Sequence, residues 1–222
     1  KKFDYGFIGD SFTEGVSLNY QDTFVGIFEN TSNATVANLG VVSYAPSIYL
    51  AKIKYLLENG FEFKHVIVGI DISDLYDDDV FYKINRDGTI SENYGKEKNL
   101  RLRKILRTSF PFTNYYLFVI KKLNTQKTTN SYIKNSDQPI FNSKAALKAK
   151  WTYSKEKIID GYENKTILAQ KKLINSMTEV HDLLKSNNIK MSVIIYPWPQ
   201  QLEHDVKDSI HVQMWEKFCI NK

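Results

Sequence analysis

The run Gly-Asp-Ser-Phe-Thr-Glu-Gly at residues 9–15 contains a serine, Ser11, that could act as a nucleophile. It follows an aromatic, β-rich run at residues 3–9, so the pattern predicts a strand that leads into a loop. Small residues and the start of a helix would leave the Ser11 hydroxyl exposed and its backbone N–H free to face an anion. The same pattern is also typical of a serine that only caps a helix.

Two further polar segments follow predicted strands. The second strand, residues 35–40, ends in Asn-Leu-Gly with Gly40 last, and the third strand, residues 65–70, runs into Asp-Ile-Ser-Asp at residues 71–74. Ligands of open parallel sheets bind beyond the carboxyl ends of the strands. We therefore expect the three polar segments to share one site.

Alternating strand and helix patterns predict an α/β protein, a three-layer α/β/α sandwich around a central parallel sheet. The expected strands are residues 3–9, 35–40, 65–70 and 190–196, and the expected helices are residues 22–29, 47–57 and 166–186. The chain of 222 residues suits one domain, 1–222.

An insertion is expected after the third strand, at residues 80–165, where the regular pattern loosens. Within it, residues 85–88 are typical of a turn, and residues 100–106 and 115–123 have helical spacing. A small helical cap is favoured, because structureless loops of such length are uncommon in compact domains.

With these segments placed, the chain resembles the SGNH/GDSL-type serine ester hydrolases, whose fold is a flavodoxin-like sandwich. The run at residues 9–15 is similar to the family's first block, GDSxxxG, with Gly9 and Asp10 supporting the nucleophile Ser11. Gly40 matches the glycine of the second block. The resemblance implies that the backbone N–H groups of Ser11 and Gly40 hold the oxyanion.

The third block of the family, GxND, departs from its usual form in this chain. Ser73 stands where the family has asparagine, and Asp74 keeps the aspartate, as in bacterial members similar to polysaccharide acetyl-modifying enzymes. Loss of one oxyanion donor costs about 3 kcal/mol of transition-state stabilisation. The Ser73 hydroxyl is expected to contribute if it reaches the oxyanion.

The fourth block of the family is Asp-x-x-His, in which the histidine is the general base. Asp208 and His211 have this spacing, but residues 200–222 have the pattern of a polar turn that enters a helix. The family's block follows a fifth strand instead. The preferred expectation is that this strand and the true pair lie beyond Lys222, so that the sequence is truncated at its C-terminus.

Composition limits the classes of partner and the locations that we expect for this protein. A formal charge of +5, with a single basic cluster at residues 96–107, gives little support for nucleic-acid binding. The one cysteine, Cys219, excludes an internal disulfide and leaves a cytoplasmic or a periplasmic location open for a soluble protein. No apolar run approaches the roughly 20 residues that span a bilayer. We expect a small-molecule or glycan ester as substrate and no cofactor. The sequence does not indicate an oligomeric state.

Several other residues have two interpretations each. The carboxylates of Asp74 and residues 77–79 could suggest a Mg²⁺ or Ca²⁺ site, but a solvated acidic loop is favoured and no metal is expected. His65, His181 and His204 have no motif around them and are assigned no role. The Tyr-Pro-Trp-Pro run at residues 196–199 predicts a rigid aromatic loop that either stacks on a sugar ring or anchors the sheet.

The first functional hypothesis is an ester hydrolase that acts on O-acetyl groups of carbohydrates through an acyl-enzyme on Ser11. Transfer to a sugar hydroxyl instead of water would make it an O-acetyltransferase. The second hypothesis is a non-catalytic glycan-binding or assembly module with the same fold, consistent with Ser73 and with the missing histidine. A flavodoxin- or response-regulator-like domain would need a phosphate-binding loop or an acidic pocket with a strand-end lysine, and the sequence shows neither.

Overall fold

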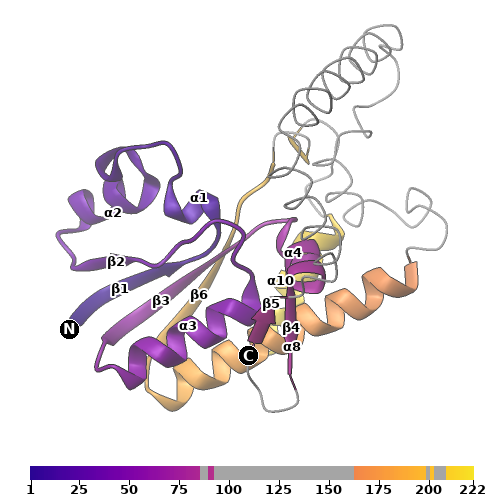
Figure 1. Ribbon diagram of the computed structural model, residues 1–222. Helices are drawn as coiled ribbons and strands as arrows, with labels where there is room; N and C mark the ends of the chain where they lie inside the picture. The colour runs from indigo at the N-terminus through magenta and orange to yellow at the C-terminus, as the bar shows by residue number, and fades with distance from the viewer. Residues whose placement is uncertain (86–89, 93–162, 199–200, 203–208) are drawn as a thin grey trace, which may run out of the picture. The chain divides into compact units, whose positions relative to one another are not determined.

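A four-stranded parallel sheet with the order β2-β1-β3-β6 forms the centre of the fold (Figure 1). Its strands are β1 (Lys2–Ile8), β2 (Val36–Asn38), β3 (Glu62–Ile70) and β6 (Lys190–Ile195). The computed structural model describes residues 1–85, 90–92, 163–198, 201–202 and 209–222. All of these belong to one unit, made of Lys1–Glu92 and Lys148–Lys222.

All of the predicted strands are confirmed, with small changes at their ends. β3 begins at Glu62 rather than at residue 65, because Glu62 pairs with Lys2 at the start of β1. Its later residues Val66, Val68 and Ile70 have no exposed surface. These three side chains share one face of the sheet and lie in the larger core, whereas Ile67 on the other face is only partly buried, against the core under α2.

Helices cover the two faces of the sheet and make two separate cores. On one face, α2 (Phe24–Ser32) packs Val25 against Phe7 of β1 and Val36 of β2. The other face packs against α3 (Pro46–Glu58), α8 (Glu163–Ser186) and α10 (Ile210–Ile220), which bury Ile53, Met177 and Trp215 in the larger core. The expected α/β layering around a parallel sheet is therefore present.

Residues 74–92 differ from the expectation for this segment. They form α4 (Asp74–Phe81) and a two-stranded antiparallel ribbon of β4 (Tyr82–Ile84) and β5 (Ile90–Glu92). The prediction of a solvated acidic loop is wrong, because Asp74, Asp77 and Asp78 are at most 4% exposed. The expected insertion helices at residues 100–106 and 115–123 and the basic cluster at 96–107 lie outside the described residues.

The buried acid of Asp78 has partners that come from distant parts of the chain. Its Oδ1 accepts a hydrogen bond from the backbone N–H of Ser47, at the start of α3 (3.1 Å). Lys172 of α8 lies 3.7 Å from Oδ2 and also donates to the Asp78 and Tyr82 carbonyls. The start of a helix favours negative charge, so the Asp78 carboxylate is stabilised at the start of α3. The acidic side chain that favoured a loop therefore fixes α4 to α3 and α8.

Candidate active site

Ser11 is the first residue of the short helix α1 (Ser11–Glu14), which begins where β1 has ended. The Asp10 carboxylate caps this helix by accepting the Phe12 N–H (2.9 Å), and Gly15 ends it in the left-handed conformation that glycine adopts freely. Ser11 is partly exposed, and within the described residues neither its hydroxyl nor its N–H has a hydrogen-bond partner. The predicted strand-to-helix turn is confirmed.

Thr13 anchors α1 onto the edge of the sheet. It is buried in the narrow space between the backbones of β1 and β3. A Cβ atom at Gly9 would lie 2.1 Å from Thr13 Oγ1, and one at Gly69 would lie 2.8 Å from it. Both glycines are therefore required for α1 to approach the sheet, which gives Gly9 of the motif a packing role.

The loop after β2 is bound to α1, so the first two predicted segments meet. Asn38 Nδ2 donates to the Thr13 carbonyl (2.8 Å), and the Val42 N–H donates to Glu14 Oε2 (2.7 Å). Gly40 approaches the helix so closely that a Cβ atom there would lie 2.3 Å from the Glu14 nitrogen. The structure thus places Gly40 beside the turn that carries Ser11.

Two of the groups proposed as oxyanion donors already have acceptors in this conformation. The Gly40 N–H donates to Asn38 Oδ1 (3.0 Å), and the Ser73 hydroxyl donates to Asp71 Oδ1 (2.7 Å). The Ser73 N–H is also directed at Asp71 Oδ1 (2.6 Å). Of the three groups, the Ser11 N–H is the one that has no acceptor among the described residues.

Asp10 and Asp71 join the ends of β1 and β3 to the aromatic segment that follows β6. The Tyr196 hydroxyl donates to Asp10 Oδ1, and Trp198 Nε1 donates to Asp71 Oδ2 (2.6 Å). The Phe12 ring, which is 47% exposed, contacts the Tyr196 ring at a centroid distance of 4.8 Å. The aromatic loop therefore lies at the predicted sheet edge, next to the residue that follows Ser11.

Burial dominates the electrostatics of this carboxylate cluster. It raises the pKa of Asp10 to about 6, with a further increase from the charge of Asp71 and an opposing effect from the Tyr196 hydrogen bond. Burial also raises the pKa of Asp74 well above its usual value, and the charges of Asp71 and Asp10 add to this. Asp74 accepts hydrogen bonds from the Tyr49 hydroxyl (3.0 Å) and the Asp71 N–H (2.7 Å). Burial therefore favours the neutral form of Asp74 at the start of α4.

His211 is a buried residue of the larger core's helix α10, where its ring contacts the Trp215 ring edge-on. Burial lowers the pKa of His211 to about 4, so its imidazole is neutral at neutral pH. Asp208, its expected partner, lies outside the described residues, and so does His204. The match of this pair to the family's fourth block, which was the less favoured alternative, therefore stays an alternative.

The remaining predictions concern histidines, metals and membranes. His65 Nε2 is 2.9 Å from Ser192 Oγ, and His181 is paired with Asp182. In the part of the chain that the structure describes, no group of His, Cys, Asp or Glu side chains is arranged to hold a metal ion. No helix there is long and apolar enough to cross a membrane.

Sequence reasoning missed the roles of Asp71, Thr13 and Tyr49 at this site. The Asp-x-Ser spacing was the available signal for Asp71, because an aspartate often accepts the backbone N–H two residues later. Thr13 and Tyr49 carry no comparable local signal, since their partners come from other elements.

Comparisons with protein-family models, curated proteins and solved structures found no match to this chain.

Proposed function

We propose that this chain is an SGNH-type serine hydrolase that acts on O-acyl esters, in particular O-acetyl groups of carbohydrates, with Ser11 as the nucleophile. The observation that carries the proposal is the position of Ser11. It is partly exposed at the start of a helix, beyond a parallel strand, and its N–H has no acceptor among the described residues. A free backbone N–H beside the serine hydroxyl is the kind of donor that stabilises the negative charge of a tetrahedral intermediate.

The chemistry requires two steps. Ser11 Oγ attacks the acyl carbon, the bond to the alcohol oxygen breaks, and the proton of the Ser11 hydroxyl ends on the leaving alcohol. Water then attacks the acyl-enzyme and releases the acid, or a sugar hydroxyl takes the acyl group in an O-acetyl transfer. In both steps the Ser11 N–H stabilises the oxyanion. The Gly40 N–H becomes a second donor if it breaks its hydrogen bond to Asn38 Oδ1 and donates to the substrate oxyanion instead.

Asp10 acts in this proposal by positioning the turn. Its carboxylate accepts hydrogen bonds from both the Phe12 N–H and the Tyr196 hydroxyl, and these fix the backbone on either side of Ser11. The exposed Phe12 ring and its neighbour Tyr196 offer an apolar surface to the alcohol or acyl part of the ester.

Active-site labelling tests the proposal. The protein is treated with a fluorophosphonate probe and assayed for hydrolysis of p-nitrophenyl acetate, beside Ser11→Ala and the matched control Ser186→Ala at the exposed end of α8. We expect labelling at Ser11 and turnover in the wild type and in Ser186→Ala. Ser11→Ala should lose the label and fall to the background rate of the reagent.

A binding module is the second candidate, and specific observations favour it. The Gly40 N–H and the Ser73 hydroxyl are already hydrogen-bonded within the chain, and His211 is a core residue. If the wild type is neither labelled nor active while it binds acetylated glycans in a pull-down, the esterase proposal fails and the binding module takes its place.

A further inference from the structure

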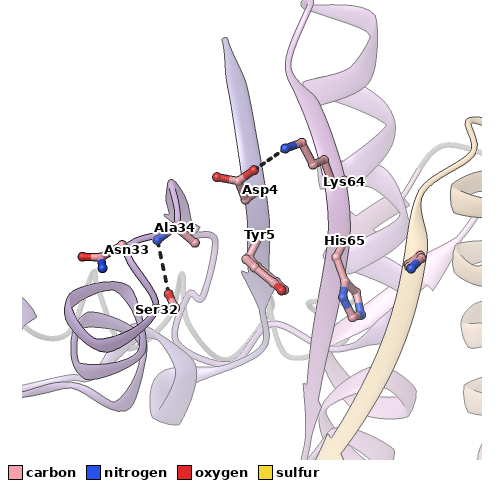
Figure 2. Close-up of a pocket in the computed structure, with 8 residues that line it drawn as sticks. Asp4, Tyr5, Ser32, Asn33, Ala34, Lys64 and His65 are labelled. Atoms are coloured by element: carbon pink, nitrogen blue, oxygen red, sulfur yellow. Dashed lines mark hydrogen bonds and ion pairs between the residues drawn. The ribbon is translucent and has the colours of Figure 1, made fainter.

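A concave site lies on the face of the sheet that α2 partly covers, near the beginning of the strands and away from Ser11. It is an open recess of about 590 Å³, and Figure 2 shows the side chains that line it. Its lining residues are Asp4, Tyr5, Ser32, Asn33, Ala34, Lys64, His65 and Lys190. This volume lies in the range of about 300–1,000 Å³ that is typical of small-molecule sites.

The floor of the recess is a row of side chains from adjacent strands. Tyr5 of β1 pairs with His65 of β3, and His65 pairs with Lys190 of β6, so the three side chains point to the same face. The Tyr5 and His65 rings lie 5.4 Å apart. Faces of parallel sheets are usually apolar because helices cover them. A polar row here indicates that this part of the face meets water or a polar ligand.

The charges in the recess do not cancel. Asp4 pairs with Lys64 (2.6 Å), an ion pair that Figure 2 marks, and its other oxygen accepts from the N–H and hydroxyl of Thr35. Burial and the nearby Lys190 ammonium lower the pKa of His65, which is therefore neutral at neutral pH. No carboxylate of the described residues pairs with Lys190. The recess thus keeps one uncompensated positive charge.

The geometry points to a binding site for a small anionic ligand in this recess, with Lys190 as the counter-charge and His65 as a hydrogen-bonding group. The ligand class is a molecule of monosaccharide size that carries a carboxylate or phosphate group. Asn33, at the end of α2, borders the recess. The inference does not depend on Ser11 or on the proposed ester chemistry.

The His65 ring provides a direct readout of binding, because an anion next to it favours the protonated imidazole and raises its pKa. The His65 ring protons of the 222-residue chain are followed by NMR through a pH titration, alone and with inorganic phosphate, with D-glucuronate or with neutral D-glucose. The spectrum of His65→Gln assigns the resonance. The two anions distinguish a phosphate-bearing ligand from a uronic acid.

We expect the His65 pKa to rise with at least one of the two anions and to stay constant with glucose. Lys190→Gln should weaken anion binding about tenfold, because one charge-assisted contact is lost. Lys54→Gln, which removes an exposed lysine of α3 outside the recess, should bind as the wild type does. Equal His65 shifts in Lys190→Gln and wild type, or no shift with either anion, would overturn the inference.

Discussion

Two aspartates near the two ends of β1 have opposite environments. Asp4 lies at the exposed beginning of the strand, and the Lys64 hydrogen bond and ion pair hold its pKa below the usual range. Asp10 follows the end of the strand, where burial raises its pKa to about 6. At the exposed end a lysine stabilises the charged carboxylate, whereas burial at the other end shifts the carboxyl group toward its protonated form. The comparison teaches that residue type alone does not determine charge state in this fold.

The largest expected effect comes from breaking the ion pair of Lys172 with the buried Asp78, which is the buried counterpart of the exposed Asp4–Lys64 pair. Lys172→Met should lower the free energy of unfolding by about 3 kcal/mol, because the buried Asp78 would lose its counter-charge. Lys64→Met removes an exposed partner and should lower the urea midpoint much less than Lys172→Met does. Urea denaturation followed by circular dichroism measures both.

A second substitution sharpens this result. Adding Asp78→Asn to Lys172→Met should recover part of the lost stability, since the amide keeps an acceptor for the Ser47 N–H without the uncompensated charge. If the double variant is no more stable than Lys172→Met, the charge of Asp78 is not the cause of the loss.

The pH dependence of stability should have opposite signs at the two aspartates. The folded pKa of Asp10 lies above its unfolded value of about 4, so the stabilisation present below about pH 4 is lost as pH rises to about 6. Asp10→Asn should therefore remove about 3 kcal/mol of this decline. The decline that remains belongs to Asp74, whose pKa is also raised.

Asp4→Asn is the matched variant at the other end of β1. Because the folded pKa of Asp4 is lowered, its stabilisation is present above about pH 4 and is lost as pH falls further. The free energy of unfolding of the variant should be lower than that of the wild type at neutral pH, and the two values should converge in acid. Urea midpoints across the pH range measure both variants, and slopes of the same sign would contradict the comparison.

The smallest expected effect is that of Tyr196→Phe. Loss of the hydroxyl that donates to Asp10 should cost about 1 kcal/mol of stability and raise the Asp10 pKa further, since this hydrogen bond lowers it. The stability profile of the variant should therefore shift to higher pH. Tyr55→Phe, which changes an exposed tyrosine of α3, is the control that should leave the profile unchanged.

Sequence reasoning recovered the elements of the sheet and the segments at its edge because each depends on local pattern. Apolar runs predicted the four parallel strands, and the rule that parallel strands end at one edge predicted that the Ser11 turn and Gly40 would meet. The acidic residues 74–79 were misjudged for the same reason. Their local composition is that of a solvated loop, and their partners Ser47, Tyr49 and Lys172 are distant in the sequence.

The sequence by itself determined the layering, the order of the strands along the chain and the turn that presents Ser11, because these follow from hydrophobic period and turn chemistry. Only the tertiary structure decided which polar groups are engaged. The hydrogen bonds from Tyr196 to Asp10 and from Trp198 to Asp71 join residues 186 and 127 positions apart. The charge state of a carboxyl group depends on such partners and on burial, and both are properties of the folded chain.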